Sequence, residues 1–238
     1  MSFKFTIIIP IYNEKDNLKR LEEELLAFIQ TSTITTKVLL INDGSTDESQ
    51  ISIESICNRN KNFSFLLFDT NYGLSTALKA GFDYTDTEFV GYIDADLQTS
   101  PKDFNSLLEH ISTYDLVTGV RKNRNDGFIK KISSKIANSI RRAFTNDGMD
   151  DTGCPLKVIK TEYAKRIPMF RGLHRFLPAM ILLQGGTVKQ IPIQHFPRLA
   201  GTSKFGITNR LLGPLIDCFA YLWMKKKRIH YKVSKQQL

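Results

Sequence analysis

The chain has 238 residues, of which 42% are hydrophobic and 24% are charged, and its formal net charge is +9. This composition is typical of a folded domain and excludes an intrinsically disordered or collagen-like chain. The three cysteines, Cys57, Cys154 and Cys218, show neither zinc-ligand spacing nor an even disulfide set, so we expect reduced thiols. No secretory signal is recognisable at the N-terminus, which predicts a cytoplasmic protein.

The charge is distributed unevenly along the chain. Residues 1–110 hold 9 Lys and Arg against 17 Asp and Glu, a net charge of −8, whereas residues 111–238 hold 24 against 7, a net charge of +17. A basic half is typical of a protein that meets nucleic acid, an anionic membrane surface or a phosphorylated substrate, although a solvated surface has the same composition. The acidic first half argues against a nucleic-acid partner.

Strand and helix patterns alternate in the first half. Apolar, β-branched runs predict buried strands at 5–12 and 89–93, and further strands are expected at 63–68 and from 38 onward. Apolar residues at helical spacing predict intervening helices over 18–29, 51–57 and 73–84. Such alternation predicts an α/β fold, with a Rossmann-like, mostly parallel sheet covered by helices on both faces. Ser45 or Thr46 is expected to cap the second helix.

Polar residues follow three of these strands, at 12–14, 42–44 and 94–98. The carboxyl ends of parallel strands meet at one edge of a sheet, where ligands bind, so we expect these residues to converge. Asp43 suits a base N–H or a ribose hydroxyl, and Tyr12 suits the face of a ring, although residues 43–45 also read as a plain turn. No glycine-rich dinucleotide motif or P-loop is present in the sequence.

The acidic motif at 94–98 is the centre of the predicted site. If the segment is extended, Asp94 and Asp96 point the same way, and a cation between them relieves their repulsion. Oxygen ligands from Asp94, Asp96 and Gln98 favour Mg²⁺ or Mn²⁺, and such an ion commonly carries a diphosphate. The alternative is an Asp-rich turn before a helix capped by Ser100, with Pro101 in the first position.

The middle of the chain is more basic. A helix is expected after Pro101, followed by a strand at 115–119. Residues 128–144 have an amphipathic pattern that suits a membrane surface, an anionic ligand or an ordinary core-facing helix. A loop at 150–157 leads to another strand and contains Asp151, a candidate for orienting a reacting group.

Further basic segments follow. His174, before a helix predicted at 177–183, is expected to be structural. After a strand at 188–193, a loop carries basic and hydroxyl side chains spaced to surround a phosphate: Arg198, Ser203 and Lys204.

The last predicted helix, over 211–224, is shorter than a membrane-spanning helix. Tyr221 and Trp223, followed by a basic run at 225–228, predict an interfacial anchor on anionic lipid. The alternative is a packed C-terminal helix with a basic tail.

Together the motifs resemble the family 2 inverting glycosyltransferases of the GT-A fold, in particular the dolichyl-phosphate mannosyltransferase-like branch. The matching segments lie at 9–14, 41–47, 71–75, 94–98, 119–121 and 198–204, over nearly the whole chain. The resemblance implies a GT-A catalytic domain over 1–208, with a donor half (1–110) and an acceptor half (111–208). Residues 209–238 would form a C-terminal amphipathic, basic segment that associates with a membrane.

The resemblance also implies roles for individual residues. The donor nucleotide would be held by Pro10, Tyr12, Glu14, Ile41, Asp43, Asp94, Ala95 and Asp96, and the metal by Asp94, Asp96 and Gln98. The acceptor phosphate would be held by Arg121, Lys130, Ser134, Arg198, Ser203 and Lys204, and catalysis would rest on Asp94, Asp96, Arg121 and Arg198. Lys130 stands where this branch often has Arg, and lysine offers a point charge in place of a bidentate fork.

The implied reaction is an inverting transfer from a nucleotide-sugar to a polyprenyl phosphate, such as undecaprenyl phosphate, by a peripheral enzyme at the cytoplasmic membrane face. Its products would serve lipid A or cell-envelope glycan synthesis. A UDP-sugar such as UDP-N-acetylgalactosamine or UDP-glucose is favoured, GDP-mannose is compatible, and homo-oligomerisation is left open. The alternatives are transfer to a polysaccharide hydroxyl, with Asp151 as the base, and a basic nucleic-acid-binding protein.

Overall fold

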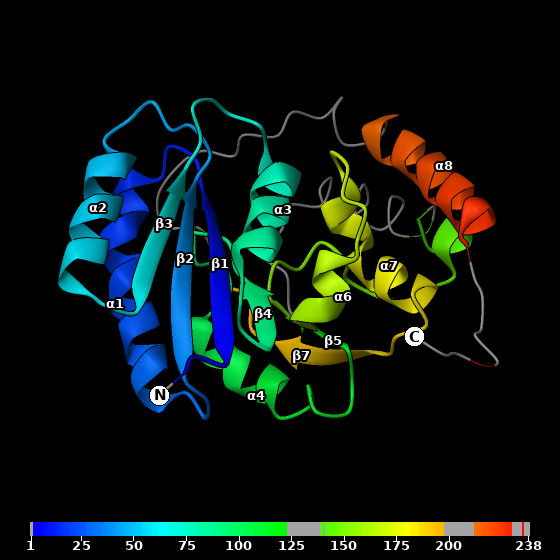
Figure 1. The fold of residues 1–238 in the computed structure, drawn as a ribbon, viewed down its shortest axis with the longest axis horizontal. Helices are drawn as coiled ribbons and strands as arrows, with labels where there is room; N and C mark the ends of the chain where they lie inside the picture. The colour runs from blue at the N-terminus through cyan, green and yellow to red at the C-terminus, as the bar shows by residue number, and fades with distance from the viewer. Residues whose placement is uncertain (1, 123–138, 140, 198–211, 230–234, 236–238) are drawn as a thin grey trace.

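The computed structural model describes residues 2–122, 139, 141–197, 212–229 and 235. Its centre is a seven-stranded sheet with the strand order β3-β2-β1-β4-β6-β5-β7 (Figure 1). Helices cover both faces of the sheet, as the alternating sequence pattern predicts.

Residues 1–110 form the parallel part of the sheet. Its strands are β1 (Phe5–Ile11), β2 (Thr36–Asn42), β3 (Phe63–Leu67) and β4 (Phe89–Tyr92). Its helices are α1 (Lys15–Thr31), α2 (Ser49–Arg59), α3 (Leu74–Tyr84) and α4 (Phe104–Leu108), the last after a 3-10 turn over Pro101–Asp103. Each predicted element of this half is confirmed. The apolar runs of β1, β2 and β4 are largely buried, whereas β3 lies at the edge of the sheet and exposes Phe65 and Leu67.

The later part of the sheet has mixed direction. Its strands are β5 (Leu116–Arg121), β6 (Lys157–Lys160) and β7 (Val188–Ile193). Its helices are α6 (Thr161–Lys165), α7 (Leu177–Leu183) and α8 (Leu212–Lys227), and a 3-10 turn at Leu173–Phe176 precedes α7. β6 runs antiparallel to both β4 and β5, whereas β5 and β7 are parallel. The loop before β6 therefore lies beside the carboxyl end of β4.

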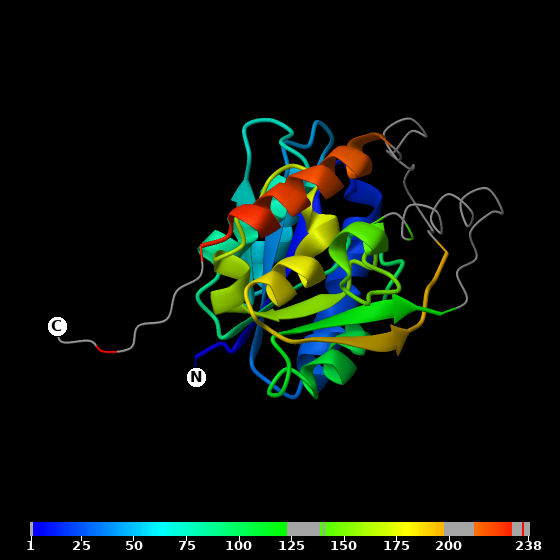
Figure 2. The same ribbon diagram turned by 90° about the vertical axis from the view of Figure 1, so that its right-hand side faces the viewer.

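Two apolar cores lie on opposite faces of the sheet. On one face α1, α2 and α4 pack together, and the ring of Phe104 lies 5.3 Å from that of Phe5 and 5.7 Å from that of Phe28. On the other face α3, α6 and α7 form the core, and α8 packs on them from outside (Figure 2). This arrangement leaves the carboxyl ends of the parallel strands uncovered by core helices.

Helix α8 presents two different faces. Tyr221, which we expected at a membrane interface, is buried and stacks on Phe176 with the ring centroids 5.9 Å apart, so that expectation was wrong. Trp223 is 65% exposed, as expected, and Ile216 and Phe219 are exposed on the same side. Among the residues that the structure describes, no helix is both long and apolar enough to cross a bilayer.

The predicted helix at 128–144 lies mostly outside the described residues. Residues 141–145 are helical, and Arg141 within them is buried and ion-paired with Asp147. The three cysteines are free thiols, as predicted.

Candidate active site

The loops after β1 and β2 interlock at the carboxyl edge of the sheet. Asn13, with φ +52°, accepts a hydrogen bond at Oδ1 from the Thr46 backbone N–H (2.7 Å) and donates its own N–H to Ser45 Oγ (2.9 Å). The Glu14 N–H donates to Ser49 Oγ (3.1 Å). Ser45 and Thr46 therefore join two loops and do not cap α2, which begins only after Glu48. Glu14 and the turn that follows Asp43 are brought together, as the sequence predicts.

Asp43 organises the next loop along this edge. Its Oδ1 accepts from the Tyr72 N–H (2.7 Å), and its Oδ2 accepts from the Gly73 N–H (2.9 Å) and from Asn71 Nδ2 (3.0 Å). Burial raises the pKa of Asp43, although the two backbone hydrogen bonds act in the opposite direction. A carboxylate offers about four lone-pair sites, so a ligand N–H or hydroxyl still has a place beside the three loop donors.

Gly44 is required at this turn. Its φ is +66°, and a Cβ there would lie 2.3 Å from the carbonyl carbon of Thr70. Any larger residue would push the loop that contains Asn71 away from Asp43. The plain turn considered for 43–45 is thus also a junction between two strand ends.

The acidic motif is a turn and not an extended segment. β4 ends at Tyr92, and Leu97 has φ +51°, so the strand alternation that we assumed for Asp94 and Asp96 was wrong. The Asp96 carboxylate accepts from the Gln98 N–H at 3.2 Å, which places both residues in one tight turn. Ser100 accepts from the Lys102 N–H and Pro101 follows it, so the cap predicted after the motif is confirmed.

The donor set of this turn fits a hard divalent cation. Within the described residues, no three His, Cys, Asp or Glu side chains gather to hold a metal by themselves. Asp94, Asp96 and Gln98 nevertheless supply only oxygen ligands from one short turn. Mg²⁺ commonly uses one or two carboxylates and completes its shell with substrate phosphates, so these residues match an ion that arrives with a diphosphate.

Arg121 and Asp151 form a buried pair at the end of β5. Arg121 Nε donates to Asp151 Oδ2 (2.7 Å), and Nη2 donates to Oδ1 (2.8 Å), with side-chain exposures of 13% and 8%. Burial alone would lower the pKa of Arg121, but the hydrogen bonds and charge of Asp151 raise it above its usual range. The guanidinium is therefore fixed in position, with one N–H edge committed to Asp151.

Electrostatics connects this pair to the acidic turn. Burial raises the pKa of the Tyr92 phenol, and the charges of Asp94 and Asp151 raise it further. Asp94 also contributes to the raised pKa of Arg121. The end of β4 and the loop before β6 thus meet around Tyr92, as expected for one site built from both halves.

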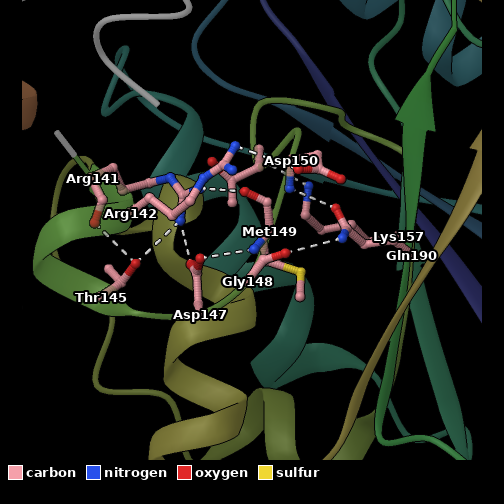
Figure 3. A network of polar contacts seen from close by, with 10 residues as sticks. Arg141, Arg142, Thr145, Asp147, Gly148, Met149, Asp150, Lys157 and Gln190 are labelled. Atoms are coloured by element: carbon pink, nitrogen blue, oxygen red, sulfur yellow. Dashed lines mark hydrogen bonds and ion pairs between the residues drawn. The ribbon is translucent and has the colours of Figure 1, made fainter. Parts of the chain in front are cut away.

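The loop that leads to Asp151 is held by a polar network (Figure 3). Arg141 pairs with Asp147 and donates from Nη2 to the Met149 carbonyl at 2.9 Å. On the other side, the Asp150 N–H donates to Gln190 Oε1 at 2.8 Å, which ties the loop to β7. The position of Asp151 is therefore set by contacts on both sides of the loop.

His174 is structural, as predicted. Its Nδ1 lies 2.8 Å from Ser75 Oγ, which also accepts from the Gly172 N–H at 3.0 Å. Burial lowers the pKa of the imidazole to about 3, and the nearby Arg175 and Lys157 charges act in the same direction. A neutral histidine thus joins α3 to the turn before α7.

The remaining predicted site residues fall into two groups, those that the structure describes and those that it does not. Pro10 and Ile41 lie on the strands that end at the site, and Ala95 is buried in the acidic turn. The remaining predicted acceptor ligands, Lys130, Ser134, Arg198, Ser203 and Lys204, lie outside the described residues. Sequence reasoning gave Asn13 no role of its own and missed Lys157, for which the one available signal was its place between the apolar residues Leu156 and Val158.

A family model described as glycosyl transferase family 2 matches residues 6–167. The chain is 29% identical to the dodecaprenyl-phosphate galacturonate synthase of Rhizobium johnstonii, covering 97% of this chain and 70% of the relative. It is 31% identical to the undecaprenyl-phosphate 4-deoxy-4-formamido-L-arabinose transferase of Pectobacterium atrosepticum, covering 90% and 66%.

Solved structures share the architecture. Glucosyl-3-phosphoglycerate synthase from Mycobacterium tuberculosis, in complex with Mn²⁺, UDP and glucosyl-3-phosphoglycerate, has a TM-score of 0.69 at 14% identity. The match covers 94% of this chain and 80% of that chain. At this identity the likeness concerns the fold, which is therefore of the GT-A type expected from the sequence.

Proposed function

The chain belongs to glycosyl transferase family 2, and from this premise we propose that it moves a sugar from a nucleotide-sugar to a polyprenyl phosphate, with inversion at the anomeric carbon. The observation that carries the proposal is a shared acceptor. The two relatives are named for unlike sugars, galacturonate and 4-deoxy-4-formamido-L-arabinose, yet both names contain a polyprenyl phosphate. The names of the relatives thus support a polyprenyl phosphate acceptor but do not agree on the transferred sugar.

The donor nucleotide would lie at the carboxyl ends of β1, β2 and β4. Asp43 would accept from the base or ribose, beside Tyr12 and Glu14 in the interlocked loops. A UDP-sugar is the favoured donor, for example UDP-N-acetylgalactosamine or UDP-glucose, and GDP-mannose is the second candidate. The sugars of the two relatives belong in the same screen.

Asp94, Asp96 and Gln98 would hold the divalent metal, Mg²⁺ or Mn²⁺, together with the donor diphosphate. When bound, such a metal offsets the negative charge that grows on the leaving nucleoside diphosphate. The protein contributes the turn that presents these oxygens, fixed by the Asp96 to Gln98 hydrogen bond.

The acceptor chemistry needs cations more than a base. A phosphate monoester has a second pKa of about 6, so its oxygen is already anionic near neutral pH and attacks without a strong general base. The difficulty is to hold this anion beside an anionic donor. Arg121 supplies a fixed positive charge, and Arg198 and Lys204, with Ser203, Lys130 and Ser134, are the further ligands proposed from sequence.

The pairing of Asp151 argues against the hydroxyl-acceptor alternative. Transfer to a polysaccharide hydroxyl would use a carboxylate base, and Asp151 is the candidate from the sequence. Both of its oxygens accept hydrogen bonds from Arg121, which stabilises the charged carboxylate and disfavours proton uptake. We therefore assign Asp151 the role of orienting Arg121 and not that of a general base.

We also propose that α8 rests on the cytoplasmic face of an anionic membrane, where the lipid acceptor resides. Ile216, Phe219 and Trp223 are 68%, 58% and 65% exposed and lie three and four residues apart on one side of the helix. The exposed lysines Lys225–Lys227 form its last turn, and the exposed Arg228 follows the helix. An apolar ridge that ends in cations matches a bilayer surface with anionic headgroups.

Trp223 is the single tryptophan of the chain and gives this contact a direct readout. Its fluorescence should shift to shorter wavelength with phosphatidylglycerol vesicles and much less with phosphatidylcholine vesicles. Ile216→Ser with Phe219→Ser should weaken the shift, whereas Ile51→Ser, at a residue 69% exposed on α2, should not. An unchanged spectrum with anionic vesicles would refute the docking surface.

The transfer itself is tested by a donor screen. Purified protein, undecaprenyl phosphate and Mn²⁺ or Mg²⁺ are incubated with each labelled nucleotide-sugar, and label in the lipid phase is counted. The proposal predicts metal-dependent labelling by one donor above the others. No labelling by any of these donors, in the presence of vesicles that the protein binds, would contradict it.

A further inference from the structure

A lysine is fully enclosed in the sheet beneath the candidate site. Lys157 opens β6, where it pairs with Tyr92 of β4 on one side and with Thr118 of β5 on the other. Its exposed fraction is 0%, the lowest value in the molecule and one shared with apolar core residues. The contacts described for its ammonium are the carbonyl oxygens of Cys154 and Thr152 (3.3 Å for the latter) and the Tyr92 hydroxyl (3.4 Å).

Burying the Lys157 ammonium among neutral groups removes it from water, which disfavours its charged form. All the acceptors around the Lys157 ammonium are neutral, and the face of the Tyr92 ring lies 5.2 Å from Nζ. Burial lowers the pKa of Lys157, although the charges of Asp151 and Asp94 act in the opposite direction. An apolar side chain of similar length would avoid that desolvation, although it would leave the carbonyl oxygens of Thr152 and Cys154 without this donor. We therefore look for the reason for a lysine at this position in the groups that its ammonium binds.

Lys157 holds the downstream side of the loop that carries Asp151. Thr152 and Cys154, whose carbonyl oxygens it binds, lie one and three residues beyond Asp151. The upstream side is held by Arg141 through Asp147 and the Met149 carbonyl. Figure 3 shows Arg141 on one side of this loop, with Gln190 and Lys157 on the other.

The same ammonium reaches the strand that leads to the acidic turn. Tyr92 is the last residue of β4, two residues before Asp94, and its hydroxyl accepts from Lys157. One buried side chain thus touches both the loop of the Arg121–Asp151 pair and the strand that ends at the donor site. Lys157 thus links the end of β4 to the loop at 151–154, two segments that are far apart in the sequence.

We propose that Lys157 is a positioning residue for glycosyl transfer: by tying the loop of Asp151 to the end of β4, it sets the place of Arg121 relative to the donor turn. The inference rests on the proposed function for its catalytic consequence only. The structural consequence, a fixed Arg121 side chain, can be measured without any substrate.

The test compares Lys157→Met and Lys157→Arg with Lys160→Met. Lys160 lies on the same strand but pairs with Asp115 away from the site, so it controls for the loss of a β6 lysine. The first readout is hydrogen exchange of the Arg121 Nε–H, which Asp151 protects, followed by ¹H–¹⁵N NMR and assigned by its loss in Arg121→Lys. The second is kcat with undecaprenyl phosphate and the best donor of the screen, and the third is the Tm.

We expect Lys157→Met to fold with a Tm no lower than that of Lys160→Met, to exchange the Arg121 Nε–H faster, and to lose kcat by about 100-fold, as misplaced catalytic groups do. Lys157→Arg, which keeps the charge and the donors, should recover part of both losses. Lys160→Met should keep the wild-type exchange rate and kcat.

Two results would overturn the inference. One is wild-type exchange and kcat in Lys157→Met. The other is a Lys157→Met protein that does not fold or whose Tm falls well below the control, because the ammonium would then serve stability. Should the wild-type chain transfer no sugar to undecaprenyl phosphate, the proposed function fails, while the exchange rate of Arg121 still decides the positioning role.

Discussion

The two halves of the chain build their parts of the site with different chemistry. In the donor half, loops are joined by hydrogen bonds between uncharged groups and single carboxylates, as between Asn13 and Thr46 and between Asp43 and Gly73. In the acceptor half, the corresponding contacts are buried charges, such as Arg121 with Asp151. The net charges of the whole halves, −8 over 1–110 and +17 over 111–238, follow the same division.

Under the proposed function, this difference would let one site hold two anions. A diphosphate that enters among the donor-half carboxylates needs a cation as its partner, which the acidic turn can bring. A lipid phosphate that entered the acceptor half would meet the positive charge of Arg121 already in place. The position of Arg121 is set by a buried counter-charge, so breaking the Arg121–Asp151 pair should affect stability and activity together, whereas changes in the donor-half loops should affect activity more than stability.

The largest effect is expected at the acidic turn. Asp96→Ala should lower metal-dependent transfer by about 1,000-fold or more, equivalent to about 4 kcal/mol in the barrier, because a metal ligand is lost. Asp86→Ala is the control, since Asp86 precedes β4 and pairs with Lys37 at the surface. Full turnover by Asp96→Ala, or an equal loss in both variants, would remove this residue from the site.

The buried pair of the acceptor half should affect folding as well. Asp151→Asn leaves Arg121 buried without its counter-charge and should lower the free energy of unfolding by about 3 kcal/mol in urea titrations. Arg121→Met with Asp151→Leu should recover the stability but not the transfer. If the double variant recovered activity, the pair would have only a structural role.

Asp43→Ala should change donor binding with a smaller effect on folding. It leaves the Tyr72 and Gly73 N–H groups without their acceptor and loosens the loop beside the nucleotide. We expect the KM for the donor to rise about 10-fold, equivalent to about 1.4 kcal/mol of binding free energy, with the KM for the lipid unchanged. Asp83→Ala on α3 serves as the control, and a larger rise in the lipid KM would contradict the division.

The smallest effect on stability is expected at His174, whose contact with Ser75 joins the two halves. Its folded pKa of about 3 lies below the unfolded value of about 6.5, so the unfolded chain takes up the proton first as the pH falls. The stability from the neutral imidazole is complete above pH 6.5 and is lost progressively toward pH 3. Between pH 7 and pH 6 the wild type should lose about 0.7 kcal/mol more than His174→Asn, and equal losses would show that His174 is not held neutral.

Much of the donor half could be predicted because its strands are local, continuous apolar runs whose polar ends mark one edge of the sheet. The turn at 94–98 could not, because the left-handed backbone of Leu97 leaves no mark in residue type. The interlocking by Asn13 was missed for a similar reason, since it depends on which loop lies opposite.

The acceptor half was harder to predict because its buried charges look like surface charges in a sequence. Lys157 and Arg141 are basic residues of a half with a net positive charge, and only the sheet order shows that Lys157 lies between β4 and β5. Tyr221 and Trp223 are two residues apart and equally suited to a membrane interface. The rotation of α8 against Phe176 decides that the first is buried and the second exposed.

The most direct test of the account compares two acceptors that differ only in the phosphate. With saturating donor and Mn²⁺, the protein is given undecaprenyl phosphate or undecaprenol in the same vesicles, and lipid-linked sugar is measured. The account predicts transfer to the phosphate alone, giving an acid-labile glycosyl phosphate of inverted anomeric configuration. Equal transfer to undecaprenol, or transfer to a saccharide hydroxyl with none to the phosphate, would contradict it.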